Sequence, residues 1–168
     1  VNGSERILCF DAVSGKVLWK HSYPSNYTIS YPYGPRTTPT VSGGKVYCLG
    51  AMGDLLCLDA GGGKVLWSKQ CVRDFDAELN TWGYSSSPLV DGKKLIVLVG
   101  GKPGACIVAF DKDSGKELWR ALEDTDPGYA SPVIFNAGGT RQLIIWTPTK
   151  LASLNPETGK EYWRQEFK

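Results

Sequence analysis

The sequence predicts an all-β fold: a β-propeller of four-stranded antiparallel blades, of which about three and a half are present. Two short patterns that recur at matched offsets predict this fold, together with a composition rich in turn formers. Of the 168 residues, 20 are Gly and 10 are Pro, and 42% are hydrophobic. This balance is typical of short strands joined by tight turns in a globular domain.

The first pattern is an 11-residue segment that begins with a small residue and ends with Trp. Its four copies align without gaps, and their Trp residues are 48, 52 and 44 positions apart. The copies are CFDAVSGKVLW (Cys9–Trp19), CLDAGGGKVLW (Cys57–Trp67), AFDKDSGKELW (Ala109–Trp119) and SLNPETGKEYW (Ser153–Trp163). The second pattern is a Ser/Thr-Pro pair that precedes the last three copies, at 38–41, 87–90 and 131–134. A repeat of this length indicates one structural unit per period.

Within each period the first strand is predicted to start at the Ser/Thr-Pro pair. The third strand ends in the first half of the 11-residue segment, and the fourth holds its Lys-x-x-Trp end. The second strand, which lies between the first and the third, covers 45–50, 94–100 or 142–147. No amphipathic helix separates these strands, which excludes a parallel βαβ sheet. The expected boundaries are one partial domain over 1–168, with a half blade at 1–20 and blades at 37–68, 86–120 and 131–167.

The repeated positions of the segment have structural explanations. Its third residue is Asp three times and Asn once, so we expect a side chain that bonds its own turn backbone rather than a required charge. The seventh is always Gly, which predicts a positive φ in the turn between the third and fourth strands; the copies are Gly15, Gly63, Gly115 and Gly159. The last is always Trp, which buries a large surface and is expected to join blades; the copies are Trp19, Trp67, Trp119 and Trp163.

The pattern A-x-D-x-x-x-G-x-x-x-W resembles the tryptophan-docking motif of the PQQ-like, or quinoprotein-type, propeller repeats. That family includes PQQ-dependent dehydrogenases and cofactor-free bacterial relatives of the BamB type. The resemblance implies that each Trp docks on the neighbouring blade, and that the protein is exported or periplasmic. It implies no cofactor in this stretch, with PQQ and calcium belonging to the complete protein if that is a dehydrogenase. The adjacent Cys pair that such dehydrogenases place over the quinone is absent from these residues.

Three and a half blades would leave an open arc with exposed strand edges. We therefore expect the chain to be part of a longer protein, with the remaining blades of that protein or another copy of this chain as partners. No basic stripe accompanies the net charge of +2, so nucleic acid is not an expected partner. The apolar runs are too short for a membrane span.

Function is expected where the repeats differ, and they differ most in the loops that join one blade to the next. Aligning these loops places six residues at one mouth of the central channel: Arg36, Trp82, Tyr84, Ser85, Asp126 and Tyr129. Here Arg36 would hold an anionic group, and the aromatic rings would stack on a planar or sugar ligand. The alternative, that these side chains only pack the loops against the channel wall, is preferred.

Two acidic clusters and the cysteines are further candidate sites. Oxygen-rich clusters can bind calcium, but those at Asp74, Asp76 and Glu78 and at Glu123, Asp124 and Asp126 lack a calcium-loop pattern, so solvated loop charge is preferred. A two-residue turn at Met52-Gly53 would place Cys48 opposite Cys57, and two reduced thiols are expected there. Because Cys, Ala and Ser share one position of the repeat, Cys9 and Cys57 are interpreted as packing residues.

The leading hypothesis is a non-catalytic propeller that binds proteins or glycans, since the repeat is strong and no catalytic constellation is found. The alternative is part of a PQQ- and calcium-dependent quinoprotein dehydrogenase of alcohols or sugars. A third hypothesis is sugar binding by Trp82, Tyr84 and Tyr129. A lone histidine, His21, offers no nucleophile–base pair for hydrolysis.

Overall fold

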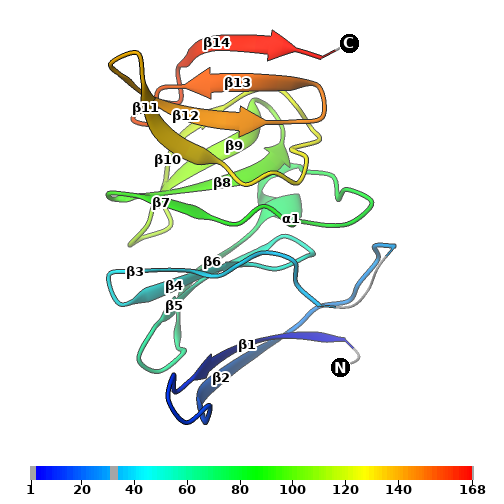
Figure 1. Ribbon diagram of the computed structural model, residues 1–168. Coiled ribbons are helices and arrows are strands. Elements are labelled where there is room, and N and C mark those ends of the chain that lie inside the picture. Colours follow the sequence, from blue (N-terminus) through cyan, green and yellow to red (C-terminus); the bar gives the residue numbers. More distant parts are fainter. Residues whose placement is uncertain (1–2, 31–33, 168) are drawn as a thin grey trace.

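The computed structural model describes residues 3–30 and 34–167, and nearly all of its regular secondary structure is antiparallel β-sheet. Four sheets follow one another along the chain, and the two ends of the chain lie at opposite ends of the stack (Figure 1). The first sheet contains β1 (Ser4–Phe10) and β2 (Val17–Pro24). The other three contain β3 (Thr40–Ser42), β4 (Lys45–Leu49), β5 (Asp54–Asp59) and β6 (Val65–Gln70); β7 (Leu89–Asp91), β8 (Lys94–Gly101), β9 (Ala105–Asp111) and β10 (Glu117–Ala121); and β11 (Val133–Ala137), β12 (Thr140–Trp146), β13 (Lys150–Leu154) and β14 (Glu161–Glu166).

Each sheet is a meander in which consecutive strands pair, so the all-β class with four-stranded antiparallel blades is confirmed. The first strand of each full blade begins one residue after the proline of the Ser/Thr-Pro pair, slightly later than expected. Proline has no N–H to donate to a strand ladder, which explains why pairing starts beyond it. A helix that the sequence does not predict, α1 (Cys71–Phe75), follows β6 and packs against β8. None of the described helices is long and apolar enough to cross a membrane.

The turn between the third and fourth strands has the predicted chemistry in every sheet. A carboxylate oxygen of Asp11 accepts the backbone N–H of Ser14 at 2.7 Å, and Asn155 does the same for Glu157 at 2.8 Å. Asn therefore replaces Asp without loss of the interaction. The glycines of these turns have φ between +68° and +72°, which confirms the predicted positive φ.

Trp side chains join consecutive sheets across these glycine turns. A methyl group placed on Gly63 would lie 2.4 Å from the ring of Trp19, and the glycine hydrogen is what lets the ring approach. The indole Nε1 of Trp19 donates to the carbonyl of Ala60 at 2.8 Å. The contact of a Trp ring with a turn glycine recurs twice, with Trp67 on Gly115 and Trp119 on Gly159, so this packing contact links all four sheets.

The apolar core lies between sheets, in three clusters, one for each pair of neighbours. The central strand β8 is buried along its whole length because sheets cover both of its faces. This explains why its sequence is a continuous apolar run rather than an alternation. Ion pairs between Lys45 and Asp113 and between Lys94 and Glu157, both 2.7 Å, also cross from one sheet to the next.

The predicted pairing of Cys48 with Cys57 is wrong. The turn between β4 and β5 holds three residues, since Gly50 N donates to Asp54 O at 2.8 Å and Gly53 has a φ of +90°. Cys48 is therefore paired with Leu56, and Cys57 with Tyr47. A shift of one residue turns side chains to opposite faces, so the two cysteines lie in different core clusters.

We expect Gly63→Ala to destabilise the protein more than Gly44→Ala does. Both glycines have positive φ, of +71° and +74°, but only Gly63 faces a Trp ring, whereas nothing lies within 4 Å of a methyl group on Gly44. Overpacking against Trp19 adds about 1–3 kcal/mol to the shared backbone cost. Urea unfolding of both variants measures the difference, and equal losses would show that the ring does not depend on this glycine.

Candidate functional site

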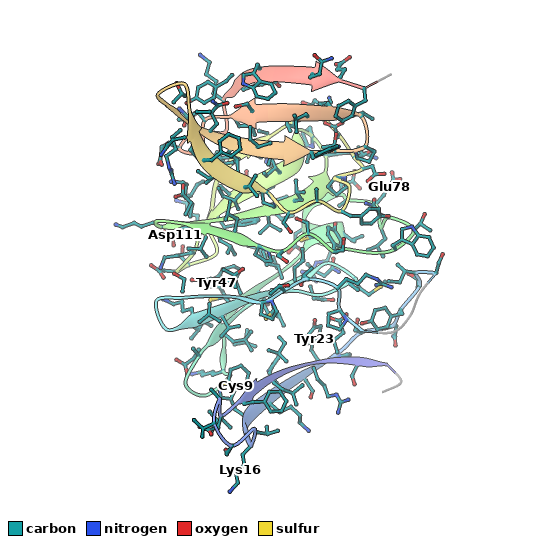
Figure 2. The ribbon with its side chains drawn as sticks, viewed as in Figure 1. Cys9, Lys16, Tyr23, Tyr47, Glu78 and Asp111 are labelled. Carbon is teal, nitrogen blue, oxygen red and sulfur yellow. The ribbon has the colours of Figure 1, made fainter. Side chains whose placement is uncertain are left out.

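The loops that join one sheet to the next lie at one end of the strands. Each loop runs from the last strand of a sheet to the first strand of the following one, and the turns between second and third strands share this end, here called the loop end. Tyr23 and Glu78 lie at the loop end, while Lys16 and Asp111 lie at the other (Figure 2). The predicted channel-mouth residues are all at the loop end.

Hydrogen bonds hold the three loops side by side where each enters its sheet. The N–H of Thr38 donates to Oγ of Ser87, and the N–H of Ser87 donates to Oγ of Ser131, both at 2.9 Å. Ser85 Oγ also donates to the carbonyl of Tyr129, at 3.5 Å. The structure thus brings together Ser85 and Tyr129, which the alignment of repeats places at equivalent positions.

The predicted aromatic residues have different environments. Trp82 is 43% exposed and Tyr129 is 41% exposed, so both present ring surface at the loop end. Tyr84 is 5% exposed, and its hydroxyl donates to the carbonyl of Val99 at 2.7 Å. Burial raises the pKa of Tyr84. The structure therefore places Tyr84 in the core between sheets and not on an open surface, while Arg36 is half-buried.

The acidic residues of the loops make separate local interactions. Asp126 accepts from Nδ2 of Asn80 at 2.8 Å and from the N–H of Gly128 at 2.9 Å, and so ties two loops together. The Arg73 guanidinium beside Asp74 lowers the pKa of that carboxyl, and Lys102 does the same for Glu78. Asp124 accepts from Thr149 Oγ1 at 2.6 Å and pairs with Lys150 at 3.2 Å, and Glu123 accepts from Gly104 N at 3.1 Å.

These carboxylates do not form a calcium site. Within residues 3–30 and 34–167, no group of three or more His, Cys, Asp or Glu side chains could hold a metal ion.

A buried carboxylate that the sequence did not predict lies between the first two sheets. Glu5 is 3% exposed and accepts from the hydroxyls of Tyr23 and Tyr27 and from the N–H of Ala51, the last at 3.1 Å. It lines a pocket of about 140 Å³ together with Arg6 and other residues of both sheets. The sequence contains a signal for this residue, because the positions aligned with Glu5 in the other three copies hold Gly53, Ala105 and Thr149, none of them acidic.

A second missed residue is Trp146, which lines an open pocket of about 250 Å³ with Tyr129. Trp146 is 58% exposed, although Leu49 and Leu98, at the same position of the repeat, are each 1% exposed. Trp146 ends a strand, outside the loops in which the sequence predicts the site.

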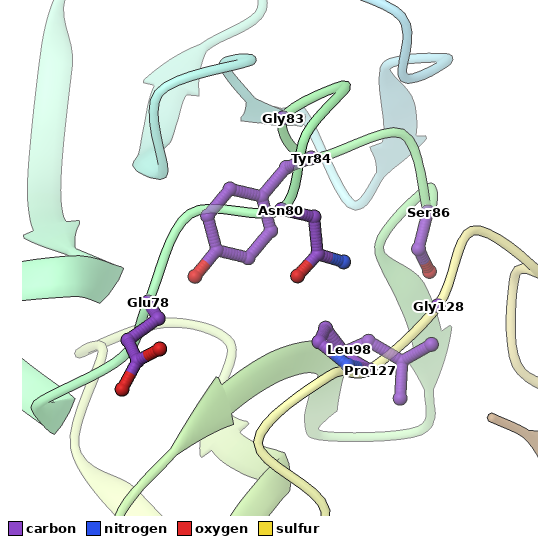
Figure 3. A pocket seen from close by; sticks show the side chains of 8 residues that line it. All are labelled: Glu78, Asn80, Gly83, Tyr84, Ser86, Leu98, Pro127 and Gly128. Atoms are coloured by element: carbon purple, nitrogen blue, oxygen red, sulfur yellow. The ribbon is translucent and has the colours of Figure 1, made fainter. Parts of the chain in front are cut away.

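The seam between the second and third loops is closed. It is lined by Glu78, Asn80, Gly83, Tyr84, Ser86, Leu98, Pro127 and Gly128 (Figure 3). No space for a water molecule remains in it. The loops pack against each other here, and exposed ring surface lies at Trp82, Tyr129 and Trp146.

The geometry supports binding through ring stacking and hydrogen bonds at the loop end. Four of the five thiols are buried and free, and His21 stacks on Tyr23 with ring centroids 6.1 Å apart.

Comparison with known proteins places these features in a family. Residues 3–168 match the model of the family described as outer membrane protein assembly factor BamB. The structure of BamB from Moraxella catarrhalis has a TM-score of 0.62 and 20% identity, over 98% of this chain and 45% of that chain. No curated protein matches.

Two enzymes are also similar in structure. A quinohemoprotein alcohol dehydrogenase from Comamonas testosteroni has a TM-score of 0.67 and 20% identity, over 95% of this chain and 32% of that chain. A europium-containing methanol dehydrogenase has a TM-score of 0.61 and 16% identity, over 95% of this chain and 38% of that chain. At these identities the likeness shows the fold alone. The chain spans less than half the length of each of these structures.

We expect four cysteines to resist thiol reagents at pH 8 in the folded protein. Burial raises the pKa of Cys57 to about 11 and those of Cys48, Cys71 and Cys106 to about 12, so these thiols stay protonated at that pH. Thiolate is the reactive form. Ellman's reagent should modify the half-buried Cys9 alone until urea exposes the rest. Rapid modification of all five thiols in the folded protein would contradict this packing.

We expect Glu5→Gln to lower the pKa of Asp54. Burial first, and then the negative charge of Glu5, raise the pKa of Asp54, and the substitution removes the second cause while leaving the first. The carboxyl carbon shift of Asp54, followed by NMR across an acid titration, measures the change. The matched control is Glu161→Gln in the last sheet, which should leave the pKa of Asp54 unchanged. If Glu5→Gln also leaves it unchanged, the charge of Glu5 does not act on Asp54 and the prediction is wrong.

Proposed function

Because this chain belongs to the BamB-like family of PQQ-type propeller repeats, we propose that it is a non-catalytic scaffold that binds other proteins at its loop end. The observation that carries the proposal is the family match, which extends over residues 3–168. The description of that family names an assembly factor for outer membrane proteins. An exported, periplasmic location follows as part of the proposal.

The binding surface proposed here contains Trp82 and Tyr129, flanked by Arg36, Ser85 and Asp126. Trp82 and Tyr129 each leave more than two-fifths of their surface exposed. Aromatic and Arg side chains dominate the binding energy of protein interfaces. Rigid packing supports them, since hydrogen bonds among Thr38, Ser85, Ser87, Tyr129 and Ser131 and between Asn80 and Asp126 hold the loops in place. The seam between the second and third loops is closed, and the pocket beside Tyr129 is open to solvent, so a protein segment that lies across this surface is favoured over a ligand enclosed by it.

The scaffold role also rests on the Trp–Gly contacts, which we take as the tryptophan-docking motif of the family. Trp19, Trp67 and Trp119 lie on Gly63, Gly115 and Gly159, and so give the loops a rigid base. A glycan is the alternative ligand for the same rings, since aromatic side chains stack on sugars.

The second candidate is a portion of a quinoprotein dehydrogenase of alcohols or sugars, favoured by the structural likeness to the quinohemoprotein alcohol dehydrogenase. In that case PQQ and calcium would be held by residues outside the part of the chain that the structure describes, because the described residues do not form a calcium site. The cofactor would accept the hydride of the alcohol.

Site-specific photocrosslinking tests the scaffold proposal. The full-length protein, carrying p-benzoylphenylalanine at position 82 or 129, is irradiated in the cells that make it. We expect the same protein adduct from both positions and none from position 93, an exposed Lys at the opposite end of the strands. Absence of adducts at 82 and 129, or equal adducts at all three positions, would overturn the proposal.

Titration of the same full-length protein with PQQ and calcium decides between the candidates. Saturable quinone absorbance together with dye-linked oxidation of an alcohol would establish the dehydrogenase. No absorbance change, with specific adducts from positions 82 and 129, is the result expected for the scaffold.

A further inference from the structure

The second and third of the loops that join the sheets are strongly acidic. The second loop (71–88) runs from β6 to β7, and the third (122–132) runs from β10 to β11. Together they contain six carboxylates and one cation, Arg73, in a chain whose net charge is +2. The first loop (25–39) has no carboxylate and one cation, Arg36. The negative charge of the loops is therefore concentrated where the second and third loops meet.

Only half of these carboxylates are neutralised within the chain. Three of them have a cation within 3.2 Å: Asp74 has Arg73, Glu78 has Lys102, and Asp124 has Lys150. The other three are exposed and form no ion pair within residues 3–30 and 34–167: Asp76, Glu123 and Asp126. Charge that the chain does not compensate is therefore presented to solvent at the loop end.

A four-residue turn holds Trp82 beside one of these exposed carboxylates. The N–H of Gly83 donates to the carbonyl of Asn80 at 2.9 Å, so Trp82 occupies the third position of this turn. The side chain of Asn80 lies at the seam with the third loop (Figure 3), where its Nδ2 donates to Asp126 at 2.8 Å. The turn that carries the ring and the carboxylate of Asp126 are therefore fixed to each other.

Neighbouring loops contact this turn on both sides. The N–H of Ser30 in the first loop donates to the carbonyl of Thr81 at 3.2 Å, and Asp126 in the third loop accepts from Asn80. With both neighbours in contact, Trp82 is still 43% exposed. The exposed ring is therefore a property of the loop end between inner sheets, and not of the first or the last sheet.

We propose that Trp82 and Asp126 bind an Arg or Lys side chain of the partner, so that the protein segment recognised at the loop end is cationic. This assignment rests on the scaffold role proposed above and adds the chemistry of its partner. A guanidinium or ammonium group is attracted to the face of a Trp ring, and a carboxylate beside the ring supplies the opposite charge. Asp126 accepts from Asn80 and Gly128 through Oδ1, and its Oδ2 accepts no hydrogen bond from the described residues.

The charge of the two loops favours this partner over the other classes. A formal charge of −5 on residues 71–88 and 122–132 repels phosphate groups, and so disfavours nucleic acids and anionic lipids. A neutral glycan would stack on the ring without using the charge of Asp126. A cationic segment uses both the ring and the carboxylate, and complementary charge also speeds its association.

Fluorescence anisotropy of the full-length protein with two labelled peptides tests the proposal. The peptides differ only in charge, since one alternates Arg with Ala and the other alternates Glu with Ala. We expect saturable binding of the Arg peptide that weakens as salt is added, and no binding of the Glu peptide. Equal binding of both peptides, or no binding of the Arg peptide, would overturn the proposal.

Three variants show whether the Arg peptide binds at this position. Trp82→Ala and Asp126→Asn should each raise its Kd about three- to fivefold. Asn keeps an oxygen that accepts from Asn80 and Gly128, so Asp126→Asn removes the charge and retains the turn. Asp113→Asn is the matched control, because Asp113 is an exposed carboxylate between β9 and β10, at the opposite end of the strands. An increase in Kd as large in Asp113→Asn as in Asp126→Asn would show non-specific attraction and overturn the site.

Photocrosslinking from position 129 distinguishes this site from the scaffold role. We expect the protein adduct to be lost in Trp82→Ala and Asp126→Asn and to be retained in Asp113→Asn. Adducts that persist in all three variants would leave the scaffold role in place and overturn the cation site. If the unsubstituted loop end gives no adduct while the Kd of the Arg peptide depends on Asp126, the scaffold role is wrong and the cation site is supported.

Discussion

The second and third sheets have apolar side chains on both of their faces, and the fold depends on covering both faces with neighbouring sheets. The Trp–Gly contact fixes how closely the sheets approach, since the ring of Trp19 fits against Gly63 only because no Cβ is present there. From this contact follow the positive φ of the glycine turns and the burial of β8 on both sides. The positions of the loops follow in turn, because each begins where a strand held by this packing ends.

The fold was predictable because each structural position occurs in several copies of the repeat. Four aligned copies separate a turn requirement from a charge requirement, as Asn155 shows by replacing Asp in the same hydrogen bonds. Details set by a single turn were not predictable in this way. The turn after Gly50 holds one residue more than the simplest hairpin, and that residue changes which face Cys48 occupies. Helix α1 was missed because five residues are too few to show a helical period.

The candidate site was predictable only in part, for a related reason. Comparing repeats identified Trp82 and Tyr129, which are exposed at the loop end. It could not show that Tyr84 turns inward, because the direction of a loop side chain depends on the next sheet. Glu5 and Trp146 differ from their counterparts as clearly as the loop residues do, yet they lie on strands and not in the loops where the repeats differ most. Departures from a repeat therefore indicate a site wherever they fall.

Each of the three core clusters lies between two consecutive sheets, so the stability of a sheet is coupled mainly to the sheets next to it. A sheet is stabilised by the sheets before and after it, as in a one-dimensional array. Among the described residues, the third sheet packs against sheets on both of its faces. Its central strands β8 and β9 should therefore be among the last to exchange their amide hydrogens.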